Sequence, residues 1–408
     1  MKVAKQIYIL QGASRAACYD LTRMRCWPID ERELQLLRQL ARGHSPRAGA
    51  DNLKSLVLMR RRGWIEPGRP VAKNLELPLA TNRAPNSKVH HVWLELTKSC
   101  NLTCSHCYAE SGPTVNRTNE LSTSEWISVV EEVLSYGVNV LTFIGGEPTI
   151  RLDLAETLAK LVRETNPKIK LRMFSNFSIP SRMQALRSFV EAYDVEIGTA
   201  IYGINAKQHD EMTGVTGSFA RTMNAIEMMR TGGVDVFVGM YVDLSAPAYK
   251  KECIEWLRSI GIKRYEVIAP SQVGRGVIKL WKMKKSKNSN KKIFSFTERN
   301  FNNAGVGHNC FLDHFAIKPN GDVSPCIMMR NYNYGNIKDT SINRILKTAL
   351  YEKISSLSKD NIEGCSECEF RYACFDCRPD AMANQSNLKT KPACGYDPRL
   401  PLDAELNE

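Results

Sequence analysis

The chain has 408 residues, of which 43% are hydrophobic, 24% charged and 8% aromatic, and its formal charge is +13. This length allows two or three domains with a sizeable core, and the composition is typical of a globular protein. No apolar run approaches the roughly 20 residues needed to cross a bilayer, and the N-terminus lacks the pattern of a secretory signal. We therefore expect a cytoplasmic protein without a membrane partner, whose positive charge suits an acidic or phosphate-bearing partner.

Residues 1–66 are expected to form a small winged-helix-like unit. Its strands are predicted over 7–10, 15–21 and 24–29. Its helices are predicted over 30–43, where Asp30 caps the start and Gly43 marks the end, and over 51–64. Residues 67–89 contain several prolines and few apolar pairs, which is typical of a linker.

Strands and helices alternate from residue 90 onwards. Strands are predicted over 91–97, 138–144, 168–174, 195–202, 234–242 and 265–269. Helices are predicted over 122–136, 152–165, 181–192, 217–231 and 247–260. Six such units predict an α/β fold with a parallel sheet, and six rather than eight favour an open, partial (β/α)6 barrel over 90–278. Its ligands are expected at the C-terminal ends of the strands.

A basic, low-complexity stretch follows the barrel. Residues 279–305 are expected to form an insertion that bridges the barrel to a C-terminal module over 306–408. The lysine-rich run favours a solvated loop, and guidance of an acidic peptide is the alternative.

Thirteen cysteines give the strongest chemical signal in the chain. In a reduced cytosol, so many cysteines indicate metal binding rather than disulfides. Ten of them form two groups: a triad with Cx3Cx2C spacing after the first barrel strand, and seven residues in the C-terminal module. The remaining three, which are Cys18, Cys26 and Cys253, are expected to be buried core thiols.

The first group, called here the triad, consists of Cys100, Cys104 and Cys107. Three thiolates on a short loop can hold three irons of a [4Fe–4S] cube and leave the fourth iron without a protein ligand. Zinc would need a fourth ligand, and the nearby His106 lies within the turn, where it is poorly placed. The triad therefore favours an iron–sulfur cluster.

The second barrel strand ends in the sequence Gly145-Gly146-Glu147-Pro148. Together with the triad one strand earlier, this resembles the radical S-adenosylmethionine (SAM) superfamily. The resemblance implies that these four residues bind SAM, with the glycines leaving room for its methionine and with the backbone and Glu147 facing its amino group.

The same resemblance extends to the third and fourth strands. Asn176 follows the third strand and is implied to contact the ribose or carboxylate of SAM. Ala200 stands where relatives carry a serine, so Thr199 is the candidate for that contact.

The resemblance also implies the chemistry. The reduced cluster passes one electron to SAM, and the resulting 5′-deoxyadenosyl radical abstracts hydrogen from a substrate. An electron donor such as flavodoxin or ferredoxin is then expected.

The seven C-terminal cysteines resemble the SPASM extension of radical SAM peptide-modifying enzymes, as do the segments NGDVSPC (320–326) and CEFRYACFDC (368–377). The resemblance implies two further [4Fe–4S] clusters, three in all. Taken alone, the spacing also suits a pair of zinc ribbons. The ligands implied for the cluster nearer the active site, called here the near set, are Cys310, Cys326 and Cys377. Those of the other cluster, the distal set, are Cys365, Cys368, Cys374 and Cys394.

The near set lacks a fourth cysteine, because residues 291–309 contain none. We infer an open iron that binds a substrate cysteine thiolate, which favours thioether formation. No catalytic acid or base is assigned. Tyr241, Asp243 and His308 are candidates for lining the cavity.

The N-terminal unit resembles the PqqD-like peptide-recognition domains that precede many maturases of ribosomally made peptides. There a leader peptide adds a strand to the sheet edge, which implies an edge over Thr22–Trp27 and a wall formed by helix 51–62. Arg60, Arg61 and Arg62 would attract acidic leader residues. A DNA-binding winged helix and a purely structural unit are the alternatives.

The combined expectation is a radical SAM peptide maturase that forms a thioether. Alternatives are carbon–carbon or carbon–oxygen cross-linking, epimerisation, sulfatase-maturase-like oxidation, and an iron–sulfur regulator that binds DNA.

Overall fold

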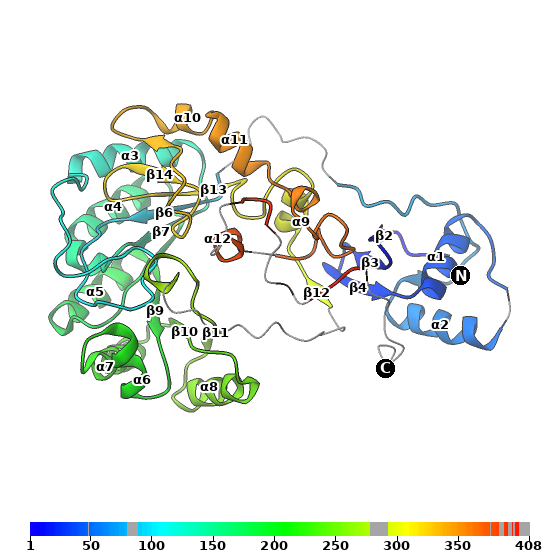
Figure 1. The fold of residues 1–408 in the computed structure, drawn as a ribbon, viewed down its shortest axis with the longest axis horizontal. Coiled ribbons are helices and arrows are strands. Elements are labelled where there is room, and N and C mark those ends of the chain that lie inside the picture. The colour runs from blue at the N-terminus through cyan, green and yellow to red at the C-terminus, as the bar shows by residue number, and fades with distance from the viewer. Residues whose placement is uncertain are drawn as a thin grey trace.

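The computed structural model describes residues 1–47, 49–79, 89–277, 293–375, 377–382, 387–390, 394 and 396–399. Figure 1 shows an α/β region at one end, the N-terminal unit at the other, and the C-terminal segment between them. Within the described residues, no helix is long and apolar enough to cross a membrane.

The N-terminal unit is a small sheet covered by two helices. Its strands are β2 (Ile7–Gln11), β3 (Ala16–Asp20) and β4 (Arg25–Ile29), all antiparallel. A capping box between Asp30 and Glu33 starts helix α1 (Glu31–Ala41). Helix α2 (Ala50–Arg61) ends just before Gly63, whose φ of +73° favours glycine. A short pair that the sequence did not predict, β1 (Lys2–Val3) with β5 (Ile65–Glu66), closes the unit.

The edge predicted at Thr22–Trp27 is not free. Strand β12 (Phe294–Ser295), from the bridging region, pairs antiparallel with β4 through Phe294–Cys26 and Ser295–Arg25. The prediction failed because a two-residue strand more than 260 positions away carries no periodic signal. Residues 279–292 of the predicted insertion lie outside the described residues, whereas 293–305 are described.

The predicted linker also packs against the unit. The backbone N–H of Ile9 donates to the carbonyl of Leu75 at 2.7 Å, which covers part of the opposite edge strand, β2. Lys73 donates from its side chain to the carbonyl of Ile7. Residues 80–88 of this stretch lie outside the described part of the chain.

The six-unit open barrel is confirmed. Its parallel strands are β6 (His91–Glu95), β7 (Val140–Ile144), β8 (Lys170–Phe174), β9 (Val195–Ile201), β10 (Val236–Tyr241) and β11 (Arg264–Ile268), and they are neighbours in that order. The crossover helices are α3 (Thr123–Ser135), α4 (Leu152–Thr165), α5 (Pro180–Tyr193), α7 (Ser218–Thr231) and α8 (Pro247–Ser259). A helix that was not predicted, α6 (Ala206–Thr213), precedes α7.

Alternation along each strand separates the core from the barrel interior. On β6, Val92 and Leu94 are fully buried members of the large hydrophobic core. Trp93 lies on the opposite face of the strand, where its ring stacks at 6.4 Å on Phe174 of β8. The interior therefore carries aromatic and polar groups, while aliphatic side chains face the helices.

The C-terminal module extends the same sheet. Strand β13 (His314–Ile317) pairs parallel with β6, and the antiparallel β14 (Asp322–Ser324) and β15 (Gly335–Asn336) follow it. The bridging region before it contains α9 (Glu298–Ala304), and the module contains α10 (Ile342–Ile345), α11 (Ala349–Ser355) and α12 (Arg378–Ala381). This module thus shares one sheet with the barrel.

The N-terminal sheet packs on the C-terminal module. The Tyr19 hydroxyl donates to the carbonyl of Glu369 at 2.9 Å, and the N–H of Ala13 donates to the carbonyl of Glu367 at 2.8 Å. A shared hydrophobic cluster surrounds Tyr19 and includes Phe296 and Phe370. The N-terminal unit is therefore fastened to the C-terminal module by a buried interface.

Candidate iron–sulfur and cofactor site

The triad sits on a loop that leaves the C-terminal end of β6. The N–H of Cys100 donates to the carbonyl of Gly112 at 3.1 Å, and that of Thr103 donates to the carbonyl of Thr213 at 3.0 Å. Because Thr213 ends α6, this helix supports the loop from the barrel side. The loop is held by its backbone, which leaves its thiols available for ligation.

The three thiols of the triad lie close enough to influence one another's ionisation. Burial raises the pKa of the Cys100 thiol to about 12, and it also raises the pKa of Cys104. Backbone N–H groups already point at sulfur: Leu102 donates to Cys100 and Ser111 to Cys107, each at 3.4 Å. Such donors suit thiolates, so the loop fits an iron–sulfur cluster whose irons displace the thiol protons.

No three His, Cys, Asp or Glu side chains of the described residues converge on the position of a single metal ion. A four-iron cube instead needs thiolates spread around its corners. The fit of the triad therefore rests on its shared burial and on the N–H donors aimed at its sulfurs.

The two glycines after β7 allow that turn to approach the triad loop. Gly145 has φ +141°, and a Cβ there would lie 2.4 Å from the carbonyl oxygen of Thr97. A Cβ on Gly146 would lie 2.2 Å from the carbonyl oxygen of Ser99. The Gly146 N–H donates to Thr97 at 2.7 Å, so the cradle is formed by backbone contact between the two loops.

The side chain of Glu147 does not face a cofactor. It is fully buried, and its Oε1 accepts from Thr149 N–H at 3.0 Å and from the Ser175 hydroxyl at 2.8 Å. Its Oε2 accepts from Asn176 N–H at 2.7 Å. The expectation that this side chain faces the amino group of SAM is therefore corrected, while the contact implied for the backbone of this segment stays a prediction. Glu147 ties the end of β7 to the end of β8, and Pro148 begins the short 3-10 helix η1 (Pro148–Arg151).

Asn176 touches the triad directly. Its Nδ2 donates to Asn101 Oδ1 at 2.8 Å and lies 3.6 Å from Cys100 Sγ. Its Oδ1 accepts from Ser178 N–H at 2.8 Å, which fixes the orientation of the amide. Asn176 is thus held beside a cluster ligand at the strand ends, where the cofactor is expected.

Thr199 cannot replace the missing serine at position 200. It shares a face of β9 with Ile197 and Ile201, which belong to the core beneath the helices. Ala200 lies on the opposite face, so a side chain at 199 points away from the site. This sequence-based candidate is therefore wrong in this structure.

Aromatic rings form one wall of the barrel interior near the triad. The ring of His106 lies 4.5 Å from that of Tyr202, which in turn lies 6.2 Å from Tyr241. Burial raises the pKa of Tyr241, and the carboxylate of Glu266 adds to that rise. The predicted lining residue Tyr241 is thus part of an aromatic wall that begins at His106 of the triad loop.

The other two predicted lining residues have structural contacts. Asp243 is exposed and accepts from Ser245 N–H at 2.8 Å. His308 is buried, stacks at 4.4 Å on Phe311 and accepts from Cys310 N–H at 3.2 Å. His308 therefore orients the loop of a near-set cysteine.

Arg275 is a site residue that sequence reasoning missed. It lies in the turn η2 (Gly274–Val277) after β11. Its Nε donates to the carbonyl of Cys104 and its Nη2 to the carbonyl of Ser111, both at 2.8 Å. The guanidinium also opposes the rise in the pKa of the Cys104 thiol that burial causes. Arg275 thus clamps both halves of the triad loop, and the Gly-Arg-Gly tripeptide at 274–276 was its only sequence signal.

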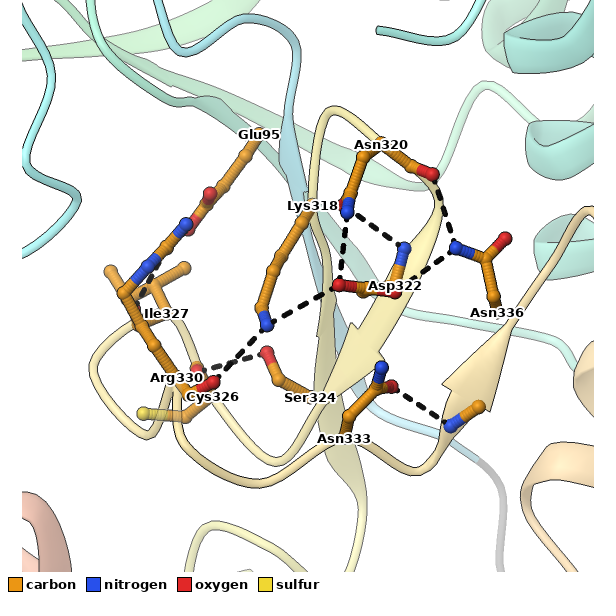
Figure 2. A network of polar contacts seen from close by, with 11 residues as sticks. Glu95, Lys318, Asn320, Asp322, Ser324, Cys326, Ile327, Arg330, Asn333 and Asn336 are labelled. Carbon is orange, nitrogen blue, oxygen red and sulfur yellow. Dashed lines mark hydrogen bonds and ion pairs between the residues drawn. The ribbon is translucent and has the colours of Figure 1, made fainter. Parts of the chain in front are cut away.

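A buried ion pair joins the near set to the barrel. Figure 2 shows Arg330 reaching from the loop after Cys326 to Glu95 at the end of β6, with Nη1 2.5 Å from Oε1. Lys318 donates to the carbonyl of Arg330 at 3.2 Å. The guanidinium of Arg330 also lies 5.8 Å from the ring of Tyr108, the residue after the triad. The loop carrying Cys326 is thereby fixed beside the triad.

Cys326 and Cys377 of the near set interact electrostatically, and Met328 N–H donates to Cys326 Sγ at 3.2 Å. Cys310 and Cys326 both pack against the large hydrophobic core, and Cys310 stays a predicted ligand.

In the distal set, Cys365, Cys368 and Cys374 influence one another's ionisation. Cys394 packs against the hydrophobic cluster that also contacts Cys368 and Cys374. Cys18, Cys26 and Cys253 are buried, as expected for core thiols, and Cys26 lies within electrostatic reach of Cys368.

Of the three arginines expected to attract a leader, one is already engaged. Arg62 is 3.3 Å from the carboxylate of Glu33, and its guanidinium lies 4.7 Å from the ring of Trp64. Arg60 and Arg61 are exposed.

Two family models match the chain. One, the radical SAM superfamily, covers residues 94–244, and the other, an iron–sulfur cluster-binding (SPASM) domain, covers residues 310–369. The chain therefore carries a radical SAM domain followed by a SPASM domain.

Curated relatives with different activities are similar to it. An AdoMet-dependent heme synthase of Oleidesulfovibrio alaskensis is 26% identical, over 75% of this chain and 87% of the relative. The antilisterial bacteriocin subtilosin biosynthesis protein AlbA of Bacillus subtilis is 23% identical, over 84% of this chain and 78% of its own.

Among solved structures, the fold resembles that of Streptococcus suis SuiB bound to the precursor peptide SuiA. The TM-score is 0.55 at 15% identity, and each chain is covered over 100% of its length. The molecule thus has the radical SAM fold, with a partial TIM-like core and a C-terminal SPASM domain, and it is a radical SAM superfamily enzyme.

Proposed function

We propose that this enzyme modifies a ribosomally synthesised precursor peptide by joining a cysteine sulfur to a carbon atom in a thioether bond. The main support is the close placement of the triad, Asn176 and the loop of Cys326 at one end of the barrel. A cluster on the triad, with SAM bound, would supply the 5′-deoxyadenosyl radical.

The chain's own residues would hold and shield the cofactor. The backbone at 145–148 and the amide of Asn176 form the candidate SAM cradle beside Cys100. The aromatic wall of His106, Tyr202 and Tyr241 would exclude water from a radical.

Thioether formation is favoured because the near set has only three cysteines, so that one iron of its cluster could bind a substrate cysteine thiolate. The substrate must lose two hydrogen atoms: one leaves carbon for the 5′-deoxyadenosyl radical, and the other leaves sulfur as a proton and an electron. Clusters on the near and distal sets would take up that electron, giving three [4Fe–4S] clusters in all. An external donor such as flavodoxin or ferredoxin would reduce the triad cluster in the cytoplasm.

The peptide partner is proposed to bind the N-terminal unit through its leader. Because β12 occupies the β4 edge at Arg25–Cys26, the leader would lie along α2. Leu53 and Val57 are 62% and 45% exposed there and share a face one turn apart, beside the exposed Arg60. An acidic leader with apolar anchors suits this face.

The test uses the anaerobically reconstituted full chain with SAM, a reductant and short cysteine-containing peptides encoded beside its gene. We expect a product that has lost two hydrogen atoms and whose cysteine resists alkylation, as seen by mass spectrometry. A product that keeps a free thiol would redirect the proposal to carbon–carbon, carbon–oxygen or epimerising chemistry. Turnover of a heme precursor with no peptide modified would replace it with the heme-synthase alternative.

A further inference from the structure

The near set has three cysteines for a four-cornered cube; residues 291–309, just before Cys310, contain no other, and Cys253 is buried in α8. The carboxylate of Asp380 lies beside two of these three cysteines. Asp380 follows Cys377 by one turn in α12, the short helix that Cys377 caps.

Two near-set thiols interact with this carboxylate, Cys377 through a hydrogen bond and Cys326 electrostatically. The Asp380 side chain hydrogen-bonds to the Cys377 thiol, and its backbone N–H donates to the same sulfur. The carboxylate also interacts electrostatically with Cys326. The carboxylate is therefore near two of the three cysteines that the sequence implies for this cluster, in the helix that Cys377 caps.

Other contacts place the carboxylate at the open end of the barrel. Its Oδ2 accepts from the Ser271 hydroxyl and its Oδ1 from the Gln272 N–H, each at 3.3 Å. Both residues follow the C-terminal end of β11, where ligands of a parallel barrel bind. Asp380 is exposed, and both bonds are long enough to yield to a stronger partner.

Helix capping does not explain this placement. In a capping box, an acidic residue at the third helical position accepts from the backbone N–H of the cap residue. Here the carboxylate bonds to the Cys377 side chain and to two residues of the barrel.

We propose that Asp380 is the fourth protein ligand of the near-set cluster and is the ligand that a substrate cysteine replaces. This rests on the proposed thioether chemistry. In the exchange, the iron–oxygen bond breaks, an iron–sulfur bond forms and the thiol proton leaves to solvent water, with no change in electron count. A thiolate is a softer ligand than a carboxylate and displaces it from iron. Ser271 and Gln272 are placed to hold the released carboxyl group.

The test needs neither SAM nor a peptide. A full chain with all three triad cysteines replaced by alanine is reconstituted, so that only the C-terminal clusters contribute to the EPR spectrum. Free L-cysteine is titrated against this protein and against the same protein carrying Asp380→Ala or Asp380→Cys. Asp339→Ala, at an exposed acid of the same module, is the matched control.

Three responses are expected. Asp380→Ala changes its spectrum at a cysteine concentration at least about tenfold lower than the parent does, because no ligand must be displaced. Asp380→Cys shows no response at full iron content, and Asp339→Ala behaves as the parent.

Identical titrations in parent, Asp380→Ala and Asp380→Cys would overturn the proposal. If Asp380→Ala loses the iron of one cluster while Asp380→Cys keeps it, the loss supports ligation, whereas loss in both overturns it. Because the readout is spectroscopic, a peptide product without a thioether would refute the proposed function and leave the ligand assignment standing.

Discussion

At the scale of single residues, the site depends on side chains that contact the triad rather than on a conventional acid or base. Asn176 spans Cys100 and Asn101, and buried Glu147 holds the backbone of Asn176. Hydrogen bonds to cluster sulfurs raise reduction potentials, and such outer contacts commonly affect activity strongly.

Asn176→Ala is therefore expected to slow SAM cleavage by roughly 10- to 100-fold and to lower the potential of the triad cluster, with iron content unchanged. The measurements are 5′-deoxyadenosine release and an EPR-monitored redox titration. Asn343→Ala, on the remote helix α10, is the control. An unaltered potential would mean that Asn176 does not act on the cluster.

Glu33 makes the N-terminal unit sensitive to pH. Burial raises its pKa from 4.5 to about 7, although Arg62 opposes that shift. The folded chain therefore binds more protons than the unfolded chain between these pH values, and stability falls as pH rises through them, by about 3 kcal/mol in all. We expect α1 amides to lose protection from hydrogen exchange between pH 5 and pH 7.5 relative to Glu33→Gln, which removes the titration. The same pH dependence of α1 exchange in the parent and in Glu33→Gln would contradict this.

At the scale of elements, turns and short strands complete the site. The turn η2 reaches the triad loop through Arg275, and β12 closes part of the N-terminal sheet. Neither element has a length or periodicity that predicts its partner.

Arg275→Ala is expected to reduce the iron held by the triad, because two carbonyls of the loop lose their donor and the thiolates lose a nearby cation. Arg275→Lys should restore part of it, since charge returns without the forked geometry. Iron analysis and the EPR signal of the SAM-bound cluster measure the effect. Arg258→Ala, on α8, is the control, and equal iron in all four proteins would refute the role.

Phe296→Ala is expected to destabilise the junction by about 3–5 kcal/mol, because this side chain is 8% exposed within the cluster around Tyr19. Hydrogen exchange of β3 and β4 should rise. Ile293→Ala, at a neighbouring side chain that is 60% exposed, should change little. Equal effects of the two substitutions would show that Phe296 does not anchor the sheet.

The barrel strands were predictable because apolar alternation and turn residues mark them locally. The side of β9 on which Thr199 lies was also predictable, because Thr199 alternates in step with Ile197 and Ile201 rather than with Ala200. The pairing of β13 with β6 and the clamp by Arg275 were not, because both join segments more than 160 residues apart and depend on tertiary packing.

At the scale of the whole molecule, one sheet and one buried interface connect the three regions. Strand β13 continues the barrel sheet into the SPASM domain, and the N-terminal sheet covers the distal set through Tyr19 and Cys26. Figure 1 shows the C-terminal segment between the other two regions. The N-terminal unit, where a peptide would bind, is therefore already joined to the regions that carry the predicted cluster sites.

The measurement that tests the central claim most directly is the release of 5′-deoxyadenosine from SAM by the anaerobically reconstituted, reduced full chain, beside Cys104→Ala. We expect the nucleoside from the parent and only background from the variant, which should retain the iron of its C-terminal sets. No nucleoside from fully iron-loaded parent protein, or equal amounts from both, would contradict the account.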